Sequence, residues 1–149
     1  MQGWFSLIVG PCFRGTAGPS NYKDNGLHTF LAAIKAAAEM ALQGAVGKLV
    51  SLPTIESILT DTNEPEDSRA SHFYSAWIGA AGIDAAQDVA ILEPLISRLL
   101  GIPRSSGRLI VANDAHIVTS PLLTVADSMS EAVVAIAGTG SVVTSFRVS

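Results

Sequence analysis

The stretch that decides the fold is HFYSAWIGAAGIDAAQD, residues 72–88. Its first seven residues, 72–78, are mostly aromatic or apolar and predict a strand. A glycine-bounded turn, GAAG, breaks this strand. Asp84 then stands three residues before Gln87, a spacing close to that of a capping box, in which two side chains satisfy free amides of a first helical turn. We therefore predict a strand, a tight turn, and a helix over residues 85–100.

The predicted helix leads on to a second strand. Pro94 lies inside the helix, where it removes one backbone hydrogen bond and clashes with a carbonyl, so we expect a kink or two shorter helices. Gly101 and Pro103 are expected to end the helix. The apolar residues 108–112 then predict a strand. This order of strand, helix and strand indicates an α/β layer fold in which at least part of the sheet is parallel.

Upstream of this unit, apolar residues recur every three or four positions, as on one face of a helix. They are Leu27, Phe30, Leu31, Ile34, Ala38 and Ala41. Gly44 and Gly47 are expected to end that helix. Residues 14–26, rich in Gly, Pro, Asn and Asp, predict a loop. The apolar residues 4–9 predict a first strand rather than the core of a signal peptide, because no basic residue precedes them.

The last third of the chain contains two short polar motifs beside apolar runs. Asp114, after the predicted strand 108–112, is expected to cap a short helix that continues to about Thr119. Two further runs, residues 132–137 and 142–148, flank the sequence GTGS and predict the strands of a hairpin. A glycine-flanked turn lets backbone amides approach phosphate oxygens, although an ordinary hairpin turn explains the same residues.

Four polar clusters each follow a predicted strand. They are Asn21, the GAAG turn, the pair Asn113 and Asp114, and the GTGS turn. Ligands of α/β sheets gather beyond the carboxyl ends of the strands, so we expect these clusters to converge on one site. Each cluster also has a structural interpretation: Asp114 as a helix cap, Asn21 as a turn residue, and GAAG as a close approach of helix to sheet.

Composition narrows the class of protein. The 149 residues are 48% hydrophobic and 15% charged, which suits one domain with a buried core and excludes disorder. The net charge of −4 and the lack of a basic stripe argue against a nucleic-acid partner. No apolar run reaches the roughly 18 residues of a membrane span. The single cysteine, Cys12, excludes a disulfide framework and predicts a reducing, cytoplasmic location. The three histidines have no metal-ligand spacing, so we predict no metal site from them.

Taken in order, four segments resemble a known family. GPSNYKDNGL, GAAGIDAAQD, VANDA and IAGTGSVV look like the N-terminal lobe of N-acetylglucosamine kinase and its relatives, the BadF/BadG-type ATPases of the sugar kinase/actin superfamily. The resemblance covers roughly residues 14–146. It implies an α/β, ribonuclease H-like (actin-like ATPase) lobe with a mixed sheet and flanking helices. It also implies that ATP and Mg²⁺ bind in a cleft between this lobe and a second one.

The resemblance assigns a role to each polar cluster. Asp114 would be the catalytic base that takes the proton from the 6-hydroxyl of N-acetyl-D-glucosamine, Asn113 would shape the sugar site, and Asn21 would hydrogen-bond the sugar. The first glycine turn would add backbone contacts to the sugar from Gly79, Ala80, Ala81 and Gly82. A second phosphate loop would comprise Gly138, Thr139, Gly140 and Ser141. A carboxylate is a suitable acceptor for a hydroxyl proton, so residue chemistry agrees with the role of Asp114.

Two departures from the family change the expectation. The first residues, MQGWFSLIVGPCFRG, lack the Asp-Gly-Gly-Gly-Thr-Lys-Thr-like hairpin that holds phosphates and supplies a carboxylate near Mg²⁺. The sequence also stops at Ser149, just after the second phosphate loop. We therefore expect residues 1–149 to form one N-terminal lobe without the second lobe, inactive as a kinase by itself, whose bare edge strand over residues 142–148 favours self-association or a homodimer.

Other functions stay open alongside the kinase. One is a non-catalytic sugar-binding or partner-binding fragment of the same family. A remote one is the activator ATPase of a dehydratase or reductase, which would use an iron–sulfur cluster that one cysteine cannot ligate alone. The expected ligands of the kinase are an amino sugar and ATP.

Overall fold

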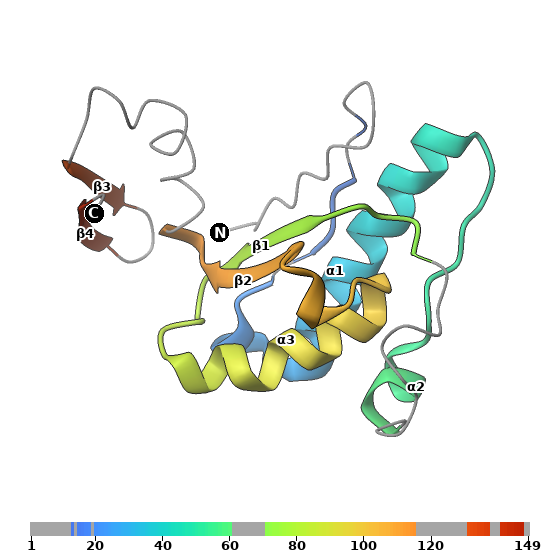
Figure 1. Ribbon diagram of the computed structural model, residues 1–149, viewed down its shortest axis with the longest axis horizontal. Helices are drawn as coiled ribbons and strands as arrows, with labels where there is room; N and C mark the ends of the chain where they lie inside the picture. The colour runs from blue at the N-terminus through green and yellow to red at the C-terminus, as the bar shows by residue number, and fades with distance from the viewer. Residues whose placement is uncertain are drawn as a thin grey trace.

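The computed structural model describes residues 13, 15–18, 20–60 and 71–115, and the backbone of residues 131–137 and 141–147 (Figure 1). The predicted strand over residues 4–9 and the predicted helix beyond Ala115 lie outside these residues. Along the chain, the described elements are two helices, a strand, a helix, a short 3₁₀ helix and three strands, so the predicted strand–helix–strand unit is present in the middle of the chain. Two of the strands and two long helices form the main body of the described fold.

Helix α1, Tyr22–Val46, is the longest element. It begins five residues earlier than its apolar periodicity predicts, because Asn21 caps a first turn that the sequence assigns to a loop. Gly26 (φ 77°) interrupts the helical backbone between that first turn and the rest of the helix. The helix continues through Gly44 and ends at Gly47, whose N–H donates to the Gln43 carbonyl from a left-handed conformation. The predicted end at Gly47 is therefore confirmed.

By length and composition alone, α1 could cross a membrane. Its 18-residue apolar window has a mean hydropathy of 1.2, and 44% of that window is buried within the protein. The buried positions form one face that contributes Phe30, Leu31, Ile34 and Leu42 to the core. Burial of one apolar face is what a core helix requires, so packing accounts for the apolar residues on that face.

Strands β1, Ala76–Ala80, and β2, Leu109–Asn113, pair in parallel, with Ala76 opposite Leu109 and Ala80 opposite Asn113. The expectation of a parallel pair is thus confirmed. The first strand lies further along the chain than residues 72–78, which corrects the prediction: Gly79 belongs to the strand because its backbone pairs with Ala112. The aromatic residues that suggested an earlier start precede the strand instead.

Helix α3, Ala86–Leu100, connects the two parallel strands, with the short 3₁₀ helix η2, Arg104–Ser106, before β2. Pro94 lies inside α3, yet α3 is one continuous element, so the alternative of two shorter helices is wrong. The carbonyl that loses its partner belongs to the exposed Ala90, so water can satisfy it. Gly101 ends α3 in a left-handed conformation, as predicted.

The cap of α3 differs by one residue from the predicted capping box. The N-cap is Ala85, not Asp84, and the carboxylate that reaches back is Asp88, not Gln87. Asp88 Oδ2 accepts from the backbone N–H groups of Asp84 and Ala85, both at 3.0 Å. Alanine has no side-chain acceptor, so only this half of the capping box is present.

The Asp88 cap makes stability depend on pH. Two backbone hydrogen bonds, from Asp84 and Ala85, lower the pKa of Asp88 below its ordinary 3.8. Because the folded pKa is depressed, the stabilisation is present in full above pH 3.8 and is lost as the pH falls through the folded pKa. We expect Asp88→Asn to lower the melting temperature at neutral pH and to converge with wild type in acid. Melting curves recorded from about pH 2 to pH 7 check this; a constant difference across that range would contradict it.

One core joins the helices to the strand pair. Its residues from the helices are Phe30, Leu31, Ile34, Ala38, Leu42, Leu92, Leu95, Ile96, Leu99 and Leu100, and those from the strands are Ala76, Ile78, Ala80, Leu109 and Val111. Helix α2, Ile55–Thr60, adds Ile55 and Ile58. Burial alternates along β1, so its inward residues face the helices while Trp77 is 44% exposed on the other face. One face of the strand pair is thus covered by α1 and α3.

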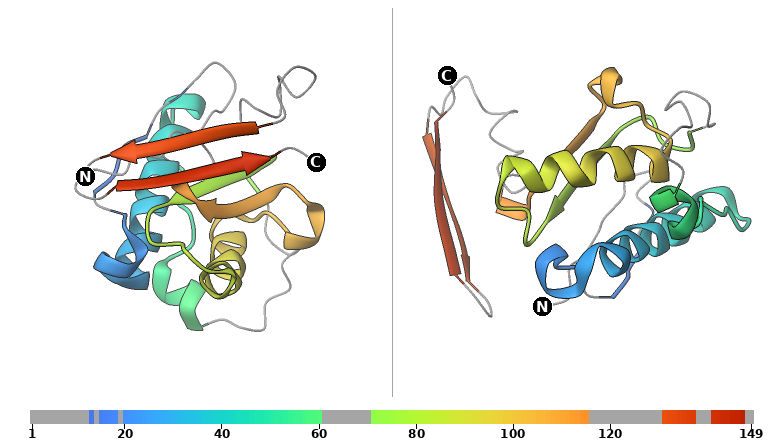
Figure 2. Two further views of the ribbon diagram at one scale, coloured as in Figure 1. Left: turned by 90° about the vertical axis from the view of Figure 1, so that its left-hand side faces the viewer. Right: turned by 90° about the horizontal axis from the view of Figure 1, so that it is seen from below.

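Strands β3, Glu131–Ala137, and β4, Ser141–Arg147, form the predicted antiparallel hairpin. Their register runs from Glu131 opposite Arg147 to Ala137 opposite Ser141. The described strands therefore form two separate two-stranded sheets (Figure 2). The resemblance implies one mixed sheet, and the two pairs are not joined into such a sheet within the described residues. The ribonuclease H-like arrangement therefore stays a prediction.

Candidate functional site at the carboxyl end of the parallel strands

The N-terminus of α1 is attached to the turn that follows β1. Asn21 Oδ1 accepts from the backbone N–H groups of Lys23 at 3.0 Å and Asp24 at 3.2 Å. The next amide, that of Tyr22, donates to the Ala81 carbonyl at 3.1 Å. Asparagine is a strong N-cap because its short side chain reaches amides that the first helical turn leaves without a partner. The cap and this backbone bond together hold the helix start beside the glycine turn.

Gly82 is the residue that permits this close approach. Its φ of 88° lies in the region that residues with a Cβ rarely adopt. A Cβ placed on it would lie 2.6 Å from Asn21 Oδ1 and 3.0 Å from the Lys23 nitrogen. Asn21 and Gly82, both predicted to belong to the sugar site, are therefore in direct contact although 61 positions separate them.

Asn113 lies at the same edge, at the end of β2 and opposite Ala80 in the neighbouring strand. Its Nδ2 donates to the Ile83 carbonyl at 3.2 Å and to Asp84 Oδ1 at 3.3 Å. Its Oδ1 accepts from the Ala115 amide at 2.9 Å. Asn113 thus connects the turn after β1 with the turn after β2.

Asp114 follows Asn113 and is half-buried. Its Oδ1 accepts from the Ala115 amide at 2.9 Å, an amide that Asn113 also caps. Since the helical residues begin at Asp114, Asn113 occupies the N-cap position that the sequence analysis gave to Asp114, which corrects that prediction. Within the described ranges Asp114 Oδ2 makes no hydrogen bond, so one carboxylate oxygen is available as an acceptor.

A charged pair that sequence reasoning missed lies beside these residues. Lys23 Nζ donates to Asp84 Oδ2 at 2.7 Å and lies 3.9 Å from Asp88 Oδ2. The hydrogen bond to Asp84 raises the pKa of Lys23 above 10.5. Both side chains of the shorter pair are about half exposed, so solvent screens the attraction and it adds little to global stability. Asp84 was noted only as a helix cap, and no local signal could pair it with Lys23.

The structure therefore brings together three of the four clusters that the sequence analysis expected to converge. Asn21, the turn ending at Gly82, and the pair Asn113 and Asp114 are linked by contacts at the carboxyl ends of β1 and β2. Of the fourth cluster, Gly138, Thr139 and Gly140 lie outside the described residues, and Ser141 is the first residue of β4. Gly79 and Ala80 belong to β1, so only Ala81 and Gly82 form the turn itself.

Mg²⁺, one of the ligands that the resemblance implies, would need carboxylate oxygens that are not already bound by other side chains. Asp84, the carboxylate beside Asn113, is already bound by Lys23 and Asn113, which leaves it poorly suited to a divalent cation. No three side chains of His, Cys, Asp or Glu come together as metal ligands in the described part of the chain. The described residues around Asp114 thus supply hydrogen-bonding groups of the kind that bind a neutral polar ligand, and the Mg²⁺ implied by the resemblance stays a prediction.

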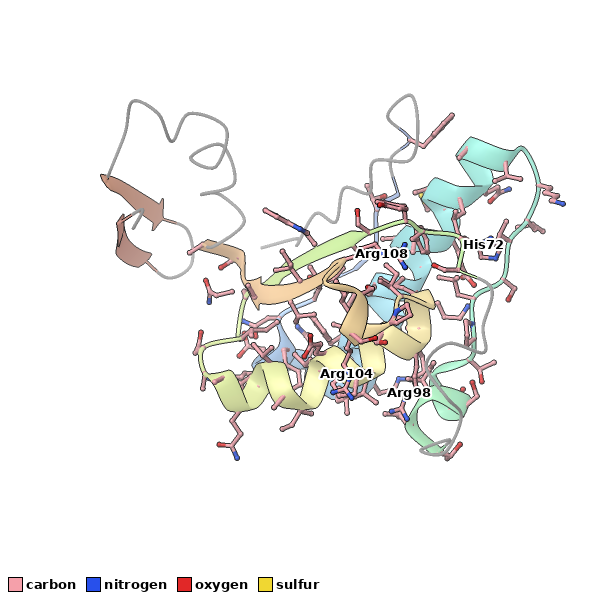
Figure 3. The ribbon with its side chains drawn as sticks, viewed as in Figure 1. His72, Arg98, Arg104 and Arg108 are labelled. Atoms are coloured by element: carbon pink, nitrogen blue, oxygen red, sulfur yellow. The ribbon has the colours of Figure 1, made fainter. Side chains whose placement is uncertain are left out.

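A hollow of about 100 Å³ lies elsewhere in the described fold, between the start of α2 and the end of α3. Its lining comprises Ser51, Leu52, Pro53, His72, Arg98, Leu99, Leu100 and Gly101. Figure 3 labels His72 and Arg98, both of which line it, and also Arg104 and Arg108. None of the predicted site residues lines this hollow. The candidate site is thus a polar edge of the strand pair and is distinct from this pocket.

Three comparisons with known proteins identified no relative of this chain. A scan against models of protein families, a search of curated proteins and a search of solved structures each found no match to this chain. The function must therefore be inferred from the site itself and from the motifs of the sequence.

Proposed function

We propose that this chain is the sugar-binding lobe of an N-acetylglucosamine kinase-like protein, a member of the sugar kinase/actin superfamily with a ribonuclease H-like fold. The observation that carries the proposal is that one edge of the parallel strands holds Asn21 packed against Gly82, and Asn113, which donates to the neighbouring Ile83 carbonyl and precedes Asp114. These are the residues to which the motif resemblance gives sugar-binding and catalytic roles. Helix capping alone explains each residue singly but does not require them to share one edge.

The available hydrogen-bonding groups suit a sugar. Asn21 uses its Oδ1 in the helix cap, and its Nδ2 makes no hydrogen bond to another described residue. Asp114 Oδ2 is an available acceptor in the same way. A sugar presents hydroxyl groups, which both donate and accept, and an acetamido carbonyl that requires a donor. An amide donor and a carboxylate acceptor at one edge match these needs.

In this proposal Asp114 accepts the proton of the sugar 6-hydroxyl as that oxygen attacks phosphorus. A positioned carboxylate is a suitable general base, and phosphoryl transfer otherwise depends on positioning and charge stabilisation. ATP with Mg²⁺ is the proposed phosphoryl donor, bound in part by the loop of residues 138–141. The proposed location is the cytoplasm, where ATP is available and Cys12 stays reduced.

Substitutions of Asn21 test the sugar site, because they separate its two hydrogen-bonding atoms. Asn21→Asp keeps an oxygen for the helix cap and removes the amide donor, and aspartate caps helices as well as asparagine does. We expect the Asp variant to melt within a degree or two of wild type and to bind N-acetylglucosamine about tenfold or more weakly, since a sugar acceptor loses its donor.

Asn21→Ala provides the matched comparison, since it loses both atoms. We expect it to bind sugar as weakly as the Asp variant and also to lose about 1 kcal/mol of stability with the cap. Titration calorimetry and thermal melts of the three proteins check both expectations. Wild-type sugar affinity in Asn21→Asp would remove Asn21 from the site and leave it as a helix cap only.

A further inference from the structure

Two side chains outside the predicted site are connected to it: Asp84 accepts a hydrogen bond from Asn113, and Lys23 donates to Asp84. Asp84 presents its two carboxylate oxygens to different partners: Oδ1 accepts from Asn113 Nδ2 at 3.3 Å, and Oδ2 accepts from Lys23 Nζ at 2.7 Å. The lysine belongs to the first turn of α1, directly after the Asn21 cap. One carboxylate therefore links the start of α1 to the end of β2.

Asp84 is one of the groups that select the orientation of the Asn113 side-chain amide. The two hydrogens of Nδ2 have two acceptors, the Ile83 carbonyl and Asp84 Oδ1. In the flipped orientation Asn113 Oδ1 would face these two oxygens and Nδ2 would face the Ala115 amide, so acceptors would oppose acceptors and donors would oppose donors. Asp84 thus favours the orientation in which Asn113 Oδ1 caps Ala115.

The orientation of Asn113 in turn affects Asp114. The Ala115 amide donates to Asn113 Oδ1 and to Asp114 Oδ1, both at 2.9 Å, so the two side chains share one donor. With Asp114 Oδ1 held in this way, the other carboxylate oxygen has a defined position. A base is effective only if it is held within hydrogen-bonding reach of the proton it accepts.

We propose that Asp84, held by Lys23, is a positioning residue that orients Asn113 and thereby fixes the Asp114 carboxylate against the sugar hydroxyl. The inference rests on the proposed function for what Asp114 does, but the link itself is independent of any sugar. It predicts that the Asp84 carboxylate matters for the geometry of the turn after β2 more than for global stability, because the ion pair is solvent-exposed.

The first test uses no ligand. In ¹H–¹⁵N spectra of the purified protein we expect Asp84→Ala to move the Asn113 side-chain amide signals and to speed hydrogen exchange of the Ala115 amide, while the melting temperature stays close to that of wild type. Asp84→Asn keeps one oxygen for Asn113, so its signals should lie between those of wild type and those of Asp84→Ala. Glu56→Gln, which changes another exposed carboxylate that lies 3.4 Å from His28 Nε2, is the control and should leave both signals unchanged. Unchanged Asn113 and Ala115 signals in Asp84→Ala would overturn the inference.

The second test adds N-acetylglucosamine and separates the inference from the proposed function. If wild type binds the sugar, Asp84→Ala should bind it about 3- to 10-fold more weakly, with Asp84→Asn between the two. Equal affinity in wild type and Asp84→Ala would overturn a positioning role toward the sugar even if the amide signals move. If wild type binds no sugar, the proposed function fails, and the amide signals alone decide whether Asp84 positions the turn.

Discussion

Asp114→Asn is expected to lower kcat for phosphorylation of N-acetylglucosamine by about 10²–10⁴, the usual contribution of a positioned general base. The amide is nearly isosteric with the carboxylate and keeps an acceptor for the Ala115 N–H, so the turn should retain its shape. The amide cannot accept a proton at neutral pH, so turnover should fall. Its oxygen still accepts a hydrogen bond, so sugar affinity should change much less. A coupled assay of ADP release, in any form of the protein that turns over, measures the effect.

Asp24→Asn is the matched control for this experiment. Asp24 also carries a carboxylate near this edge, in the first turn of α1, and its exposed side chain makes no hydrogen bond to a described residue. The same change of charge there should leave kcat within a factor of about two, because solvent screens the charge of an exposed side chain. An unchanged kcat in Asp114→Asn would remove Asp114 from the role of base. Sugar binding without turnover in every form of the protein would instead favour a non-catalytic sugar-binding function.

Gly82→Ala should destabilise the protein by about 2–5 kcal/mol, the sum of a disfavoured backbone conformation and overpacking. The new methyl group would lie 2.6 Å from Asn21 Oδ1, so either the cap or the turn has to move. The atoms nearest the methyl group, apart from that oxygen, are backbone nitrogens of α1, which cannot rotate away as a flexible side chain would. We therefore expect loss of sugar binding together with the fall in stability, measured by urea unfolding and calorimetry.

Gly107→Ala separates backbone strain from the contact with α1. Gly107 also has a positive φ, of 65°, but a Cβ there would meet nothing within 4 Å. Its substitution should cost about 1–2 kcal/mol, the strain contribution alone, and leave sugar binding unchanged. If Gly82→Ala costs no more than Gly107→Ala, the close packing of the β1 turn on α1 is not important for stability.

The elements with local signals could be predicted from the sequence. The end of α1 at Gly47 and the end of α3 at Gly101 follow from glycine's access to the left-handed conformation, which both residues adopt. The hairpin follows from two apolar runs around a short glycine turn. The nearness of Gly82 and Asn113 also followed from sequence, because parallel strands place the residues after them at one edge. Asn21 reaches the same edge as the N-cap of α1, and the strand predicted before it lies outside the described residues.

The remaining features depend on contacts between distant residues. The start of β1 was predicted four residues early because aromatic side chains suggest a strand, whereas pairing with β2 decides where the strand begins. The ion pair of Lys23 with Asp84 joins residues 61 positions apart, and neither position has a distinctive local pattern. Residues 138–140, predicted from their motif to belong to a phosphate loop, lie outside the described residues, so that role remains a prediction.

The central claim is that the edge formed by Asn21, Gly82, Asn113 and Asp114 binds an amino sugar. The most direct measurement is a titration of the ¹⁵N-labelled protein with N-acetylglucosamine, with glucose as the comparison, followed in ¹H–¹⁵N spectra. We predict saturable shifts confined to the amides of these residues and their neighbours, at lower concentrations for N-acetylglucosamine than for glucose. A folded protein whose spectra do not change with either sugar up to tens of millimolar, or change only at residues remote from this edge, would contradict the claim.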